Sequence, residues 1–234
     1  MKEAFITGAN KGLGVGFVEV LVQQGYRVFA GVRRPKEFSF NDPNVIPIEL
    51  DLGNSRSIDL AIKKITSQAN QLSLIINNGA VQRNSPELGG AEKVCKLEQI
   101  SKESLLKMFE INAVAPLMIL KGLVPILKSE PSYCINISSA RSVLYTDETP
   151  HQSANYGYRA TKAALSSITM ASTFDLPPSV RTFSVHPGLI KTDMNPKGNL
   201  CPQQGAALIL SIADRWEPSM NGAFLRNDGT RWEL

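Results

Sequence analysis

The sequence predicts an α/β protein in which one doubly wound parallel sheet of about seven strands carries helices on both faces, in a single domain over residues 1–234. Short apolar runs typical of buried strands alternate with longer segments whose apolar residues recur at helical spacing. The first run leads into a glycine-rich turn and an apolar helix, the order that opens a Rossmann-like fold. With 234 residues, 43% of them hydrophobic, the chain is long enough for one substantial core and short for two.

The composition narrows the class of protein. The net charge is +4, but the basic residues are scattered, so we expect no nucleic-acid partner and assign the charge to an anionic small molecule. The apolar run before the glycine turn is too short for a signal peptide, and no later stretch approaches the ~20 apolar residues of a membrane span. Cys95, Cys134 and Cys201 lack metal-ligand spacing. We therefore expect a cytoplasmic protein with no metal site and no membrane segment.

The first predicted unit is a strand at residues 3–7, a turn, and a helix from Val15 to Gln24. The turn reads Thr7-Gly-Ala-Asn-Lys-Gly-Leu-Gly14, and its glycines let the backbone approach a pyrophosphate closely. The N-terminus of the following helix offers unpaired N–H groups to the phosphates. The glycine spacing differs from the common GxGxxG form, but the strand before it and the helix after it supply the context of a dinucleotide-binding turn.

The second predicted strand, Arg27 to Val32, ends at Arg33-Arg34. Many NAD-binding folds place an acidic residue at this point to hold the ribose 2′-hydroxyl, and such a residue repels a 2′-phosphate. Arginine instead attracts the phosphate through charge-assisted hydrogen bonds, and Lys11 in the glycine turn can add a second positive charge. The position therefore predicts NADP(H). The alternative is that the two arginines are simply solvated at the strand tip. That explanation is as good as phosphate binding for Arg34 and weaker than it for Arg33.

Two more strands and a helix are predicted before residue 80. A strand from Val45 to Leu50 is followed by Asp51-Leu52, where an adenine ring can meet a carboxylate and an apolar side chain, although Asp51 can equally cap a helix. The segment Ser55 to Ala69 carries a helical apolar stripe. A strand from Leu72 to Ile76 leads into Asn77-Asn-Gly-Ala80, whose small residues suit a tight turn against the cofactor.

The rest of the chain continues the alternation. Residues 82–100 lack a clear period and predict a surface loop. A long helix is predicted from Ser101 to Leu127, and Asn112 inside it needs hydrogen-bond partners, for which the neighbouring backbone is the simplest source. The remaining predicted elements are a strand Ser132 to Ile137 ending in Ser138-Ser139, a helix Asn155 to Phe174, a strand Arg181 to His186 with the turn Pro187 to Met194, a helix Gln203 to Asp214, and a strand Gly222 to Leu225.

Tyr158 and Lys162 lie four residues apart in a good helix former, so both side chains share one helix face. An ammonium beside a phenol favours the phenolate and lowers the phenol pKa from about 10. Such a tyrosine can give or take a proton at a carbonyl oxygen. An isolated pair of this kind can also be no more than helix surface.

These motifs, in this order and spacing, resemble the short-chain dehydrogenase/reductases over essentially the whole chain: the glycine turn, Asn77-Asn78, Asn112, Ser139, Tyr158-x-x-x-Lys162 and Pro187-Gly188. The run His-Pro-Gly-x-x-Lys-Thr-Asp-Met194 and the ending Gly222-Ala-Phe-Leu-Arg-Asn-Asp-Gly229 with Trp232 are most similar to the C-factor-like and sniffer-like carbonyl reductase branch.

The resemblance implies a role for each matched residue. Tyr158 is the expected acid/base, and Lys162 lowers its pKa and holds the nicotinamide ribose. Ser139, with Ser138 as the alternative, binds the substrate oxygen, and Asn112 holds a water in the proton relay. The implied cofactor contacts are Gly8, Asn10, Lys11, Gly12, Leu13, Gly14, Arg33, Asp51, Leu52, Asn78, Gly79, Ala80, Tyr158, Lys162, Pro187, Gly188, Ile190 and Thr192, with Asp51 and Asn78 beside the adenosine and Thr192 beside the nicotinamide carboxamide.

Three positions depart from the family pattern. Gly79-Ala80 reverses the usual order after the paired asparagines, although both residues stay small. The distance from Ser139 to Tyr158 is longer than is common, so residues 143–155 are expected to form an extended loop beside the substrate. Ser142 stands where the family often has glycine, which leaves open which serine is catalytic.

The sequence therefore predicts an NADP(H)-dependent oxidoreductase that reduces a small-molecule aldehyde or ketone. A dinucleotide-binding signalling or scaffold protein with little turnover is the alternative. The two apolar-striped helices, Ser101 to Leu127 and Asn155 to Phe174, are surfaces through which the family pairs, so a homo-oligomer, either dimer or tetramer, is expected and a monomer is the alternative.

Overall fold

The computed structural model describes residues 1–90, 95–143, 154–193 and 195–232. In these residues the strands form one sheet in the order β3-β2-β1-β4-β5-β6-β7, and every neighbouring pair is parallel. The strands are β1 Glu3–Thr7, β2 Arg27–Val32, β3 Val45–Glu49, β4 Leu74–Asn77, β5 Ser132–Ile137, β6 Val180–His186 and β7 Phe224–Arg226. The predicted fold class is confirmed, and no strand end differs from the predicted one by more than two residues.

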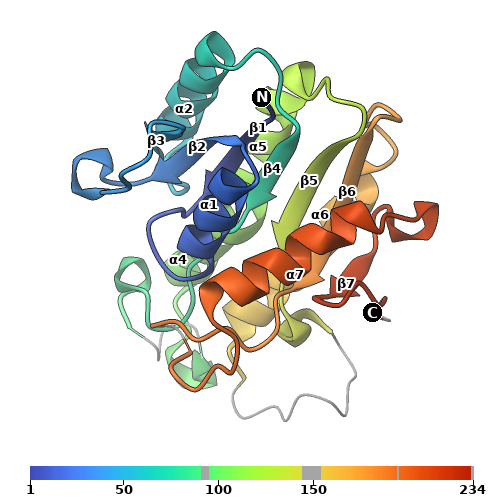
Figure 1. Ribbon diagram of the computed structural model, residues 1–234. Coiled ribbons are helices and arrows are strands. Elements are labelled where there is room, and N and C mark those ends of the chain that lie inside the picture. The colour runs from blue at the N-terminus through green and yellow to red at the C-terminus, as the bar shows by residue number, and fades with distance from the viewer. Residues whose placement is uncertain (91–94, 144–153, 194, 233–234) are drawn as a thin grey trace.

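Helices cover both faces of the sheet (Figure 1). They are α1 Leu13–Gln23, α2 Ser55–Gln68, α4 Lys102–Phe109, α5 Ala115–Leu123, α6 Tyr156–Ser172 and α7 Pro202–Asp214. Because side chains alternate along a strand, Ala4 and Ile6 pack with α1 and α7 in one core cluster, whereas Phe5 packs with α2 and α5 in the other. After β3 the chain crosses back and adds β4 on the other side of β1, so the direction in which strands are added reverses there. Ligands bind at the carboxyl ends of the strands beside such a switch point.

The predicted helix Ser101 to Leu127 is interrupted. It divides into α4, a π-helical turn Glu110–Val114, α5 and a short 3-10 turn. Pro116 has no N–H, so it cannot donate the ordinary α-helical hydrogen bond to the carbonyl of Asn112. Single π turns inside helices are frequent at functional sites, and this one carries a predicted site residue.

The combined helical run Lys102–Ile126, 25 residues with a mean hydropathy of 1.5, is long and apolar enough, by length and composition alone, to cross a membrane. On that measure the expectation that no stretch approaches such a length is wrong. However, 44% of the most apolar 18-residue stretch of this run is buried inside the protein. Its apolar side chains Ile119, Leu120 and Leu123 belong to the core cluster beneath α5. The core helix of a soluble protein passes the same test of length and hydropathy.

The predicted surface loop 82–100 contains local structure where it is described. Two 3-10 turns, Pro86–Leu88 and Leu97–Gln99, lie in it, and Leu88 is fully buried against Val81 and Met108. This part of the chain is therefore anchored to the body of the protein. Most of the predicted extended loop, residues 144–153, lies outside the described residues.

Candidate active site

The predicted site residues come together at the carboxyl edge of the sheet. Parallel strands place their carboxyl ends at the same edge, so the segments that follow six different strands meet there. These segments are the glycine turn after β1, Arg33 after β2, Asp51-Leu52 after β3, Asn78-Gly79-Ala80 after β4, Ser138-Ser139 after β5 and Pro187–Thr192 after β6. In Figure 1 this edge lies below the sheet, opposite the N-terminus.

The glycine turn fits a pyrophosphate. Helix α1 begins after Gly12, whose φ of 55° suits glycine, and no side chain caps its first turn. A Cβ on Gly8 would lie 2.8 Å from the Cα of Gly79, and one on Gly14 would collide with the carbonyl of Gly8. The turn is therefore closed tightly by backbone, and the N–H groups at the start of α1 stay free of side-chain caps and can bind an anion.

Asn78 and Thr7 hold this turn against β4. Nδ2 of Asn78 donates to the carbonyl oxygens of Thr7 (3.1 Å) and Gly8 (3.2 Å). Oγ1 of Thr7 accepts from the backbone N–H of Asn78 (3.0 Å) and of Gly79 (2.9 Å). The tight turn expected here is present, in spite of the reversed Gly79-Ala80 order. Asn78, predicted to line the adenosine, uses its amide to fix the phosphate-binding turn.

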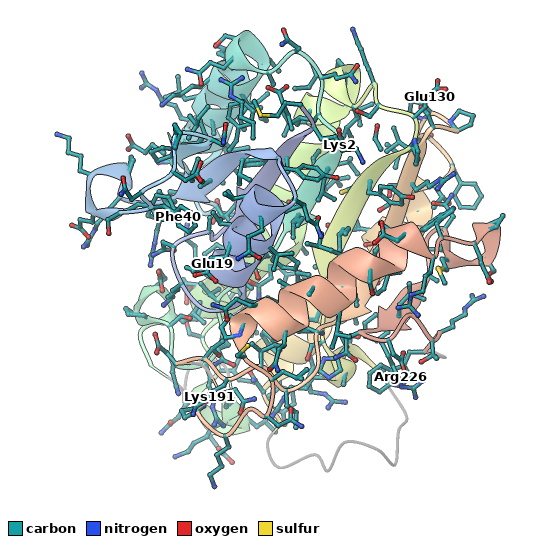
Figure 2. All side chains as sticks on the ribbon, viewed as in Figure 1. Lys2, Glu19, Phe40, Glu130, Lys191 and Arg226 are labelled. Atoms are coloured by element: carbon teal, nitrogen blue, oxygen red, sulfur yellow. The ribbon has the colours of Figure 1, made fainter. Side chains whose placement is uncertain are left out.

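A cavity of about 980 Å³ opens beside the glycine turn and the tip of β2. Its lining includes Asn10, Arg33 and Arg34, together with the residues Val15, Glu19, Glu37, Phe38, Ser39, Phe40, Asn41, Pro86 and Glu87. Figure 2 labels Glu19 on α1 and Phe40 on the segment after β2, two of these residues. Lys11, predicted to support Arg33, is not among them, and Arg34 is. The cavity thus joins a cationic strand tip to the phosphate-binding turn.

The other predicted cofactor residues take different positions. Oδ1 of Asp51 accepts from the N–H of Gly53 (2.9 Å), and the N-cap of α2 is Asn54, so the alternative that Asp51 caps the helix is wrong. Leu52 packs against Gly79. Leu13 is buried in the core, so only its backbone can face a cofactor.

The turn after β6 completes this side of the site. Thr192 lies against Gly12, so the predicted carboxamide contact lies beside the phosphate-binding turn. Pro187 and Gly188 are held by Asn227, whose Nδ2 donates to the carbonyl of Pro187 (3.3 Å), and Ile190 packs against Gly205.

Helix α6 brings Tyr158 and Lys162 to the end of β5, as their spacing predicts. Lys162 is only 2% exposed, and its Nζ donates to the carbonyl oxygen of Ile137 at 2.7 Å. Burial lowers the pKa of Lys162 to about 7. Its Nζ lies 5.8 Å from the centre of the Tyr158 ring. The pair therefore combines a phenol with an amine that can change charge near neutral pH.

The pKa of Tyr158 moves opposite to the sequence expectation. Removal of its phenol from water raises the pKa, and a side-chain hydrogen bond with Ser139 and the positive charge of Arg141 lower it by less. Burial also lowers the pKa of the neighbouring Lys162, so it disfavours the charged form of both groups. With the pKa raised, the phenol is protonated at neutral pH, the form that donates a proton.

The structure separates the candidate serines. Oγ of Ser138 donates to the carbonyl of Lys162 (3.1 Å) and shares a hydrogen bond with Ser166 (2.9 Å), so it is used in packing α6 on β5. Oγ of Ser142 donates to the carbonyl of Ser139 (2.7 Å). Only Ser139 of the three acts on Tyr158. This geometry favours Ser139 as the serine beside a reacting oxygen.

Asn112 uses its side chain to join three segments. Its Oδ1 accepts from the N–H of Val81 (2.8 Å), and its Nδ2 donates to the carbonyl of Val81 (2.9 Å) and to Oγ1 of Thr161 (3.1 Å). The partners are not the local helix backbone, as the simplest alternative had it, but residues 31 and 49 positions away. The amide therefore holds the segment after β4 against the helix that carries Tyr158.

Asn112→Leu is expected to lower the free energy of unfolding by about 2–4 kcal/mol, because the N–H and carbonyl of Val81 lose their partner and each such buried group costs about 1–3 kcal/mol. Urea unfolding of the variant and of the unmodified protein measures the difference. Asn70→Leu, at an exposed residue, is the matched control and should change stability by less than about 0.5 kcal/mol. A similar small loss for Asn112→Leu would show that other groups satisfy Val81.

Sequence reasoning missed two residues that the site uses. The charge of Arg141 lowers the pKa of Tyr158. The one sequence feature that could have identified Arg141 is its position two residues after Ser139, a candidate catalytic serine. Thr161 connects Asn112 to α6, and although it belongs to the family-like run Tyr-x-Tyr-Arg-x-Thr-Lys162, the sequence assigned it no role. Within the described residues, no group of three or more His, Cys, Asp or Glu side chains could hold a metal ion.

A parallel sheet with a glycine turn after its first strand and a tyrosine and lysine after its fifth defines a nucleotide-binding α/β protein. The family model described as short chain dehydrogenase matches residues 2–200. The chain belongs to the short-chain dehydrogenase family.

Comparisons with individual proteins agree with this family. An uncharacterised oxidoreductase of Schizosaccharomyces pombe is 26% identical, covering 98% of this chain and 96% of the relative. The carbonyl reductase Sniffer of D. melanogaster is 25% identical with a TM-score of 0.86 over the full length of both chains. A short chain dehydrogenase from Burkholderia cenocepacia in complex with NADP is 28% identical with a TM-score of 0.76, covering 97% of this chain and 89% of that one. Within the family, the chain is thus a member of the carbonyl reductase branch.

Proposed function

We propose that this oxidoreductase is an NADP(H)-dependent carbonyl reductase with Tyr158 as its acid/base. The observation that carries the proposal is the grouping of Ser139, Tyr158 and Lys162 at the sheet edge that also holds the phosphate-binding turn. The similarity to a carbonyl reductase over the full length of both chains supports the same reaction class.

The residues of the chain divide the reaction between them. NADPH, when bound, supplies the hydride that the carbonyl carbon accepts. The phenol of Tyr158 gives its proton to the carbonyl oxygen, and its raised pKa keeps that proton available at neutral pH. The hydroxyl of Ser139 holds the oxygen where negative charge develops. Lys162, whose pKa burial lowers to about 7, can return a proton to the phenolate through Nζ.

The preference for NADP(H) rests on the cationic strand tip. Arg33 and Arg34 both line the cavity beside the phosphate-binding turn, where a 2′-phosphate on the adenosine ribose can be bound. The NADP complex of the Burkholderia cenocepacia relative supports this choice.

Arg33→Asp is expected to weaken NADPH binding by at least about tenfold and to shift the preference towards NADH, because a charge-assisted hydrogen bond is replaced by repulsion. Fluorescence titration with both cofactors measures the two affinities. Arg56→Asp makes the same charge change at an exposed residue of α2 and should leave both affinities unchanged. Equal affinities of the unmodified protein for NADPH and NADH would contradict the assignment.

We also propose a homo-oligomer. Several large apolar side chains are exposed on the two helices expected to pair and at their ends: Leu106, Val114, Met118, Tyr156, Met170 and Phe174. Phe174, at the end of α6, is 81% exposed, and a second copy of the chain would cover it. Light scattering at micromolar concentration is expected to give at least the dimer mass, and a monomer mass would contradict this.

The reaction itself is tested by NADPH oxidation with a panel of aldehydes, ketones and quinones. Turnover with at least one carbonyl class is the expected result. Tight NADPH binding with no turnover on any of them would favour a binding protein without turnover. We propose a cytoplasmic location, which suits a chain whose described cysteines form no disulfide.

A further inference from the structure

Arg33 forms an ion pair with Glu87 in the wall of the cavity beside the glycine turn. The two residues are 54 positions apart, Arg33 directly after β2 and Glu87 in the 3-10 turn Pro86–Leu88. The Arg33 side chain is 60% exposed and that of Glu87 is 24% exposed. The arginine assigned to the cofactor phosphate therefore already has an anionic partner from the protein.

Glu87 is presented by a turn that the protein holds firmly. The neighbouring Leu88 is 1% exposed and packs in the cluster with Val81, Met108 and Ile111. Its carbonyl accepts from Oγ of the buried Ser104 (2.9 Å). Because Leu88 points into the core, Glu87 is left facing the cavity, so its position there is a consequence of the fold.

A 2′-phosphate and the Glu87 carboxylate are both anions that bind a guanidinium through the same N–H groups. When both approach Arg33, they share its donors and repel each other. A ribose 2′-hydroxyl has neither effect, since it is neutral and can donate a hydrogen bond to a carboxylate. The ion pair thus opposes one form of the cofactor and tolerates the other.

We infer that Glu87 is a specificity-determining residue that competes with the cofactor 2′-phosphate for Arg33 and so limits the preference for NADP(H). The inference rests on the proposed function, because it concerns the same cofactor site. It predicts that removing the Glu87 charge strengthens binding of the phosphate-bearing form alone.

Calorimetric titration with adenosine 2′,5′-bisphosphate and with 5′-AMP tests this without any need for turnover. Glu87→Gln is expected to raise the affinity for the bisphosphate by about tenfold, which is about 1.4 kcal/mol, and to leave the affinity for 5′-AMP equal or lower. Glu98→Gln removes the same charge at an exposed residue of the same segment and outside the cavity lining, and should change neither affinity. In an Arg33→Ala background, the gain from Glu87→Gln should disappear.

Three results would overturn the inference. The first is an unchanged bisphosphate affinity in Glu87→Gln, and the second is an equal gain in Glu98→Gln. The third is a gain that persists without Arg33, since it would show that Glu87 repels the phosphate without competing for the arginine. If the unmodified protein binds NADPH and Glu87→Gln has no effect, only this inference fails. If it binds neither NADPH nor NADH, the proposed function fails as well.

Discussion

Tyr158→Phe is expected to lower the turnover of a carbonyl substrate by at least about a hundredfold while NADPH binding stays close to that of the unmodified protein. The substitution removes one oxygen atom and leaves the ring, so packing within α6 is preserved. That oxygen carries the proton that the carbonyl needs, and general acid catalysis is worth about 10²–10⁴-fold. Steady-state turnover and NADPH titration measure the two quantities separately.

Tyr156→Phe is the matched control. Tyr156 opens the same helix, is 42% exposed, and has Ala160 rather than lysine four residues on. Its variant should keep turnover within about twofold, since an exposed hydroxyl away from the site contributes little. If Tyr158→Phe retained near-normal turnover on a substrate that the unmodified protein reduces, the proposed mechanism would be wrong and Tyr158 would serve only packing.

The sequence was sufficient for the parts of this site that depend on local spacing. The order of strand, glycine turn and helix predicted the uncapped start of α1. Four-residue spacing placed Tyr158 and Lys162 on one face of α6. Alternation of apolar runs predicted the parallel sheet, because each run could be assigned a period without knowing its neighbours.

Features that depend on distant neighbours could not be predicted in this way. The π turn at Asn112 is joined to Val81 and Thr161, and the pairing of Arg33 with Glu87 crosses the cavity, so each needs the folded chain. The direction of the Tyr158 pKa failed for a related reason. Spacing shows which charge is near, but only the packed structure shows how much water both groups lose, and desolvation outweighs the neighbouring charge here.

Lys162→Met is expected to lower turnover by at least about a hundredfold and NADPH affinity by about tenfold, whereas Tyr158→Phe changes turnover alone. The variant keeps an apolar stem in the same buried space but loses the amine, which both returns a proton to Tyr158 and binds the cofactor ribose under the proposed function. Lys121→Met, at an exposed residue of α5, is the matched control and should change neither quantity.

The pH dependence of NADPH binding separates a charged role of Lys162 from a packing role. Without cofactor, burial holds the pKa of Lys162 at about 7, so the amine is mostly charged below pH 7 and mostly neutral above it. An anionic cofactor favours the ammonium, and binding above pH 7 must therefore take up a proton. The affinity for NADPH is therefore highest below pH 7 and falls as pH rises towards 9, by up to about tenfold per pH unit.

Titrations from pH 6 to pH 9 should show this slope in the unmodified protein and in Lys121→Met, and a flat profile in Lys162→Met. A slope that persists in Lys162→Met would assign the titration to another group and remove the amine from the proton pathway.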